Sequence, residues 1–209
     1  INEAGLNLVK EKEGLYLTSY PDIESELGRA CKTNGIKVYN NEYKKLAGWE
    51  KLSGTPWTIG YGSTGVDIKA GMTWTKEQCE ARLLLKMAEF EKGVASRIKV
   101  PLTSNQFSAL CSFCYNLGMG PLTEGSIDDK LNAKNFKAAT DTMLLYNKAG
   151  KPPVVVAGLT KRRQLEVALF QKPEAPISPA KNSGVLGNGP SEDDIKKMLS
   201  DIESKILSK

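Results

Sequence analysis

Two acidic residues near the start of the chain have the types and spacing of a general acid and its partner. Glu13 closes a helix-like run, INEAGLNLVKEKEG, and Asp22 follows nine positions later. The last carbonyls of a helix carry partial negative charge, so this position disfavours an ionised carboxyl. Partial burial would act in the same direction, and a protonated carboxyl can donate a proton to a leaving group. The alternative is an exposed glutamate at a Lys/Glu-rich helix end, as we expect for Glu11.

The absence of histidine narrows the chemistry that the chain can perform. With no histidine in 209 residues, Ser-His and Cys-His catalysis and His-ligated zinc are excluded. Carboxylates are then the natural acid and base, and we expect neither a cofactor nor a metal. The favoured interpretation of the four cysteines is that they are buried small hydrophobic residues, with a disulfide and a metal site as alternatives. They are Cys31, Cys79, Cys111 and Cys114.

The charge and hydropathy of the chain indicate the kind of partner. A net charge of +5 favours an anionic partner, with ordinary solubility as the alternative. Nucleic acid would fit the charge, but no helix-turn-helix, zinc or RNA-binding signature supports it, so we expect none. No run of about 18 apolar residues occurs, so we expect no stable membrane insertion.

The elements around the two acids form a small β-rich region. A helix is predicted over 2–13 and strands over 15–20 and 57–62, the latter, WTIGYG, with glycines at tight turns. Asn34-Gly35, in CKTNGIKVY, predicts a hairpin. Asn41 is predicted to cap a short helix, NEYKKLAGW.

A helical majority follows this region, which predicts an α+β fold with segregated lobes and a site between them. A capping box of Thr75 and Gln78 opens the longest helix, 76–98. Further helices are predicted over 104–117, 126–132, 135–146 and 159–171.

The composition changes after residue 172. The predicted organisation is a catalytic domain over 1–172, with a β-rich lobe at about 15–70, and a linker over 173–190. An amphipathic helix is predicted over 191–209, and we expect it to dock on the enzyme body or on another chain. The chain is expected to be a monomer.

Four stretches resemble one family in the same order. They are the Glu13-Gly14 helix end with Asp22 and then TIGYG, followed by GVDIKAGMTWTKEQCEARL, SNQFSALCSFCYNLGMG and NKAGKPPVVVAGLTKRRQLEVALF. Together these resemble the phage-type lysozymes and endolysins, glycoside hydrolase family 24, over about residues 2–171. The resemblance implies a lysozyme-like fold in which a long helix joins a small β lobe to a helical lobe.

The resemblance also implies a reaction on peptidoglycan glycan strands, namely hydrolysis of the β-1,4 bond between N-acetylmuramic acid and N-acetylglucosamine. Glu13 would protonate the leaving oxygen, while Asp22 and Thr58 hold the attacking water on the other face of the sugar. The expected outcome is inversion, for which the two carboxyl groups lie about 6.5–9.5 Å apart. A phage enzyme of this kind would be made in the host cytoplasm and act on the periplasmic wall, by an export route that the sequence leaves open.

Three further residues are matched to supporting positions. Arg162 resembles the arginine that pairs with the catalytic glutamate; a surface arginine is the alternative for it and for Arg163. Asn116 resembles a residue near the sugar, or else a polar residue that finishes a helix. Tyr61 would line the cleft, or simply pack.

Two departures from the family pattern stand out. Ser63 replaces the usual histidine, and we expect activity to survive with a different local hydrogen bond. Residues 23–57 replace a short turn, and Trp49 and Trp57 there would stack on sugars or, as favoured, fill the core of the lobe. The alternative function is a lysozyme-fold protein that binds the wall or has a structural role without hydrolysis.

Overall fold

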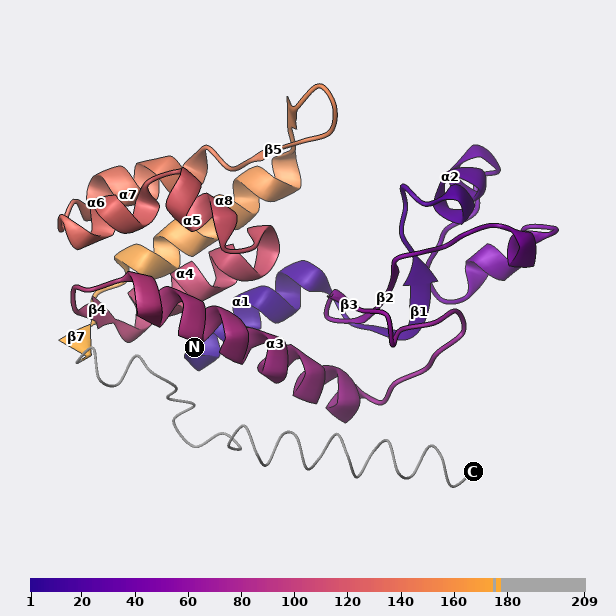
Figure 1. Ribbon diagram of the computed structural model, residues 1–209, viewed down its shortest axis with the longest axis horizontal. Helices are drawn as coiled ribbons and strands as arrows, with labels where there is room; N and C mark the ends of the chain where they lie inside the picture. Colours follow the sequence, from indigo (N-terminus) through magenta and orange to yellow (C-terminus); the bar gives the residue numbers. More distant parts are fainter. Residues whose placement is uncertain (175, 178–209) are drawn as a thin grey trace. The chain divides into compact units, whose positions relative to one another are not determined.

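The computed structural model describes residues 1–174 and 176–177 (Figure 1). Among these residues, contacts define two units: a sheet unit of residues 13–85, and a helical unit that holds residues 1–12 and the described residues between 86 and 177. Two helices run from one unit into the other along the chain, α1 (Glu3–Glu13) and α3 (Lys76–Arg97). The predicted helix that precedes the first strand and the predicted longest helix are both confirmed. The C-terminal helix proposed for 191–209 lies outside the described residues.

The sheet unit is built on three antiparallel strands in the order β1-β2-β3. They are β1 (Tyr16–Pro21), β2 (Trp57–Gly60) and β3 (Ser63–Thr64). Strand β1 pairs with β2 although 35 residues separate them, and a register irregularity between Tyr16 and Tyr20 marks a bulge. The glycines of WTIGYG form tight turns as predicted, because Gly60 and Gly62 have φ of +67° and +77°.

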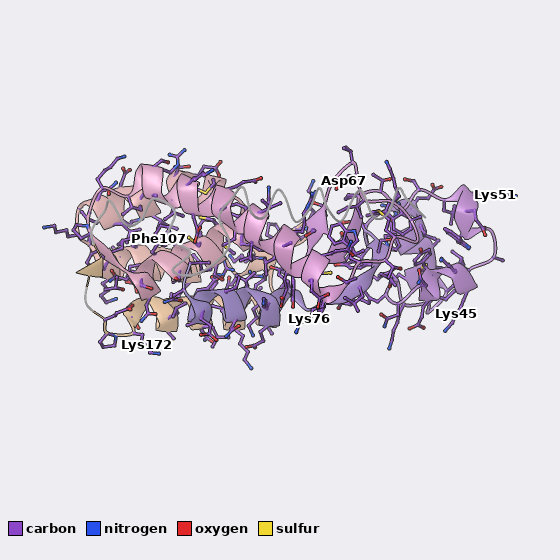
Figure 2. The ribbon with its side chains drawn as sticks, turned by 90° about the horizontal axis from the view of Figure 1, so that it is seen from below. Lys45, Lys51, Asp67, Lys76, Phe107 and Lys172 are labelled. Atoms are coloured by element: carbon purple, nitrogen blue, oxygen red, sulfur yellow. The ribbon has the colours of Figure 1, made fainter. Side chains whose placement is uncertain are left out.

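The segment inserted between β1 and β2 folds into short helices. These are α2 (Glu26–Thr33) and two 3-10 turns, η1 (Glu42–Lys45) and η2 (Trp49–Lys51). Asn41 precedes η1 as predicted, but its side chain makes no capping hydrogen bond. Figure 2 labels Lys45 and Lys51 on these two turns, where both side chains are exposed.

The predicted hairpin at Asn34-Gly35 is wrong. These residues end α2: Gly35 takes φ of +66°, its N–H donates to Lys32, and the N–H of Ile36 donates to the Cys31 carbonyl. This is a Schellman motif, which needs a residue with positive φ just past the helix. A two-residue hairpin turn also needs residues with positive φ, so the Asn-Gly pair fits both structures. The distinguishing signal was upstream, where Ser25 caps the helix through the N–H of Gly28.

The inserted segment has a hydrophobic core that it shares with β2. The fully or almost fully buried members are Leu27, Cys31, Val38, Tyr43, Trp57, Ile59 and Ile68. Trp57 is 9% exposed, and Trp49 is partly buried with its ring centroid 5.2 Å from that of Tyr43. Both tryptophans therefore fill the core of the lobe, and the sugar-stacking alternative is wrong for Trp57.

The helical unit is organised around α4 (Ser104–Leu117), which packs chiefly against α8 (Ala157–Gln171). Around them lie α5 (Gly120–Glu124), α6 (Ile127–Asn132) and α7 (Phe136–Leu144). Helix α5 was not predicted; the other helices follow the predicted spans closely. Thr103 and Gln106 form a reciprocal capping box at the start of α4.

Two small strand pairs complete this unit. Strand β4 (Leu102–Thr103) pairs with β7 (Pro176–Ile177), and β5 (Lys148–Ala149) pairs with β6 (Val154–Val155). Neither pair was predicted, and β7 falls in the segment proposed as a linker.

All four cysteines are buried free thiols, as the favoured interpretation predicted. Over residues 1–174 and 176–177, no helix is both long and apolar enough to cross a membrane. Within the same described part, no three Cys, Asp or Glu side chains gather as metal ligands would.

Candidate active site

Glu13 lies at the C-terminal end of α1, where Gly14 ends the helix with φ of +70°. The side chain is half-buried and its carboxylate lies against the backbone of Gly62. A Cβ atom at Gly62 would be 2.9 Å from Glu13 Oε2. The last glycine of WTIGYG therefore leaves room for this carboxylate. Glycine is favoured at this position for two reasons, the positive φ of the turn and the space that the carboxylate occupies.

Asp22 directly follows β1, at the point where the chain leaves the sheet for α2. Its N–H donates to the carbonyls of Gly54 and Pro56, each at 3.1 Å. Its Oδ1 accepts from the N–H of Glu24 at 2.7 Å, and its carbonyl accepts from the N–H of Ser25 at 3.1 Å. Bonds on both sides hold this aspartate in a fixed position, with its side chain half-buried.

The strand register brings Thr58 to the same part of the sheet. Tyr20 pairs with Thr58, and Pro21 pairs with Trp57. Side chains alternate along a strand, so the paired Tyr20 and Thr58 share one face. Asp22 lies two positions after Tyr20, just beyond the end of β1. The opposite face of β2 carries Trp57 and Ile59 into the core.

Tyr20 is a functional candidate that the sequence analysis missed. Its phenol lies close enough to interact with the Thr58 side chain and within electrostatic range of the Glu13 carboxylate. Burial raises the pKa of Tyr20 well above its ordinary value, with smaller contributions from the phenols of Tyr39 and Tyr16 and from Glu13. The phenol is therefore neutral near neutral pH. Its position exactly opposite a candidate threonine depends on register, which the sequence did not reveal.

Two residues beside this sheet take structural places. Tyr61 is 5% exposed, in agreement with the packing alternative. Ser63 is 7% exposed, and among the described residues its Oγ has no hydrogen-bond partner. Within the described part of the chain, the hydrogen bond expected at Ser63 has no protein partner.

Asn116, on α4, and Arg162, on α8, belong to the helical unit. Asn116 Oδ1 accepts from Arg163 Nη2 at 2.8 Å, and Arg162 Nε donates to Glu166 Oε1 at 3.2 Å. Arg162 is 4% exposed and Arg163 is fully buried, so the surface alternative is wrong for both arginines.

Glu166 is the buried anion that balances these arginines. Its Oε1 accepts from the Ser112 hydroxyl at 2.9 Å and from Arg163 Nη2 at 3.2 Å, while its Oε2 lies 3.0 Å from Arg163 Nε. Burial raises the pKa of Glu166, against the opposing effect of both guanidinium groups. Burial also lowers the pKa of Arg163 to about 10. The spacing of KRRQLE on one helix was the available signal, since residues three and four apart face one another.

Comparison with known proteins places these features in a family. The model of the Phage lysozyme family matches residues 37–166. The chain is 38% identical over 143 residues to the endolysin of Salmonella phage P22, covering 66% of this chain and 95% of that protein. The chain belongs to the phage lysozyme family.

A further relative and a solved structure extend the comparison. The chain is 35% identical over 170 residues to the endolysin of Bacillus phage B103, covering 81% of this chain and 53% of that relative, so it spans about half of the latter's length. The solved muramidase domain of SpmX from Asticaccaulis excentricus superposes with a TM-score of 0.64 at 26% identity, covering 83% of this chain and 98% of that one. The expected family and lysozyme-like fold are confirmed.

The range matched by the family model includes only some of the candidate site residues. The matched range includes Thr58, Asn116 and Arg162 but begins after Glu13 and Asp22. The roles expected for the two acids therefore stay predictions, for which the structure offers the contact of Glu13 with Gly62 and the position of Asp22 directly after β1.

Proposed function

We propose that this chain is an endolysin-type muramidase that hydrolyses the β-1,4 bond between N-acetylmuramic acid and N-acetylglucosamine in bacterial peptidoglycan. The enzyme would be made in the host cytoplasm and would act on the cell wall, and its role would be lysis of the host cell by a phage. The observation that supports the proposal is membership of the phage lysozyme family in a chain whose Glu13, Asp22 and Thr58 each lie on or next to the β1–β2–β3 sheet.

The proposed first event is proton donation by Glu13 to the glycosidic oxygen as the bond to the anomeric carbon breaks. The Glu13 carboxyl lies against the backbone of Gly62, because this glycine has no side chain to keep it away. A positioned acid of this kind typically accelerates a reaction by about 10²–10⁴-fold.

The proposed second event is attack of water on the anomeric carbon from the opposite face of the sugar. Asp22 accepts the proton that the water loses, while the Thr58 hydroxyl fixes the water's position. Because water and leaving group would occupy opposite faces, the product should carry the inverted configuration. Observing the anomer that is released first, by NMR, tests this step.

Charge supports the choice of substrate. Peptidoglycan carries lactyl and peptide carboxylates, and the net charge of +5 favours binding of such a polymer. Activity should therefore fall as salt rises and screens the attraction.

The experiment that tests the proposal is clearing of outer-membrane-permeabilised bacteria, with release of reducing ends as a second readout. Glu13→Gln should lose about 10²–10⁴-fold in rate while the protein stays folded. Glu11→Gln is the matched control, because Glu11 lies in the same helix end, 67% exposed and paired with Lys12. Equal clearing by wild type and Glu13→Gln would remove the proposed acid, and absence of reducing ends with wild type would favour a wall-binding protein.

Variants of the other two residues test the water site. Asp22→Ala and Thr58→Ala should each reduce turnover strongly with little change in melting temperature. A neutral Thr58→Ala would show that the threonine opposite Tyr20 does not hold the water.

A further inference from the structure

The inserted segment of residues 23–57 contributes one ring to a cluster of three tyrosines beside the candidate acid. Tyr16 and Tyr20 come from β1, and Tyr39 comes from the insertion. The ring centroids of Tyr16 and Tyr20 are 4.9 Å apart, those of Tyr20 and Tyr39 are 4.8 Å apart, and those of Tyr16 and Tyr39 are 4.6 Å apart. Tyr20 meets both neighbours edge to face, an arrangement that restricts its ring.

The restricted ring lies opposite Thr58. Tyr20 and Thr58 are directly opposite in the β1–β2 register, and the Tyr20 phenol lies close enough to interact with the Thr58 side chain. A threonine hydroxyl has one donor and two acceptor positions, so a bond to Tyr20 would leave two positions in defined directions. A water molecule at Thr58 would therefore meet a hydroxyl whose orientation is already set.

The inserted segment also holds the other face of the strand that carries Thr58. Trp57 and Ile59, on either side of Thr58, are 9% and 0% exposed in the core built by α2 and η1. Its residues therefore pack against Trp57 and Ile59 of β2, and they reach Tyr20 through Tyr39, since both tyrosines pack against the same core.

We propose that Tyr20 is a positioning residue that orients the Thr58 hydroxyl, and that the inserted segment holds Tyr20 in place through the ring of Tyr39. This inference rests on the proposed function, in which Thr58 fixes the attacking water. It gives the insertion a role in the reaction that does not require contact with the sugar.

The test is a double-mutant cycle on the full chain, with kcat and KM measured from reducing-end release on soluble peptidoglycan. Tyr20→Phe keeps the ring and removes only the hydroxyl. We expect kcat to fall about 10-fold with KM within about twofold of wild type, as for a reacting group displaced by a fraction of an ångström. In the Thr58→Ala background, Tyr20→Phe should have no further effect, because the hydroxyl it orients is gone.

The matched control is Tyr39→Phe, which removes a hydroxyl from the same cluster and keeps the ring contacts. It should retain wild-type kcat and KM, whereas Tyr39→Leu, which removes the ring, should lower kcat in wild type and have no further effect in Tyr20→Phe. Since the Tyr20 phenol is neutral, Tyr20→Phe should leave the shape of the pH–rate profile unchanged. Melting temperatures identify any variant whose loss reflects unfolding.

Three results would overturn the inference. One is independent, multiplicative losses in the Tyr20→Phe/Thr58→Ala cycle, and another is a rise in KM alone, which would indicate a sugar contact. The third is a wild-type rate for Tyr20→Phe. If Glu13→Gln is inactive in that last case, the muramidase proposal stands and only the positioning role fails.

Discussion

Replacing Gly62 by alanine gives the sharpest test of where the candidate acid lies. The added Cβ would be 2.9 Å from Glu13 Oε2, whereas ordinary contacts begin at 3.4 Å, so the carboxylate must withdraw by about 0.5 Å. A misplacement of about 1 Å can cost about 10²-fold, so a shift half as large should lower kcat by about 10-fold.

The same substitution has a separate effect on stability. Gly62 has φ of +77°, and a residue with a Cβ atom in this region costs about 1–2 kcal/mol. For a domain of this size that corresponds to a fall in melting temperature of about 2–8 °C. The protein should remain folded at 25 °C, because domains commonly have about 5–15 kcal/mol of stability.

Gly35→Ala separates the two effects. Gly35 has φ of +66°, and a Cβ atom there would meet nothing within 4 Å. The Gly35→Ala variant should show a fall in melting temperature similar to that of Gly62→Ala, but it should clear permeabilised cells at the wild-type rate. A Gly62→Ala protein that clears cells at the wild-type rate would refute the placement of Glu13. Equal loss of activity in both variants would show that backbone strain alone is responsible.

Three further predictions concern buried groups. Glu166→Gln should lower the free energy of unfolding by about 3–5 kcal/mol, because it removes the buried negative charge that both buried guanidinium groups contact. Urea titration measures this, and Glu89→Gln, in an exposed pair with Lys86, should show no measurable change. Ser63→Ala should raise the free energy of unfolding by about 1 kcal/mol and preserve activity, because the buried hydroxyl it removes lacks a protein partner within the described chain. A destabilised variant would show instead that the Ser63 hydroxyl makes a stabilising hydrogen bond. Burial raises the pKa of Cys79 to about 11, so about one thiol in 10³ is ionised at pH 8, against about one in four for an ordinary cysteine. Labelling by an aromatic disulfide should therefore be slow at pH 8, faster as pH rises toward 11 and immediate in guanidinium; rapid native labelling at pH 8 would contradict the burial.

Short-range signals determined most of the helices and one end of the site. The spacing of apolar residues and the Thr75–Gln78 capping box predicted α3 nearly to the residue, and the predicted helix over 104–117 matches α4, because caps and helical periodicity act within one or two turns. The same reasoning placed Glu13 at a helix end followed by a left-handed glycine.

Short-range signals failed where one local conformation serves two structures. Asn34-Gly35 takes the positive φ that a hairpin would need at its glycine, but the chain uses it to end α2. Tertiary packing decided between them, since Leu27 and Cys31 bury one face of that helix.

Only the tertiary structure decided the rest of the site. The pairing of Tyr20 with Thr58 joins residues on either side of the insertion, and register between distant strands follows from which faces are buried. The core that takes Trp57 and Ile59 leaves Thr58 on the face of Tyr20, and the missing Cβ of Gly62 admits Glu13 beside them. The sequence thus determined which residues could do the chemistry, while long-range packing determined that they meet.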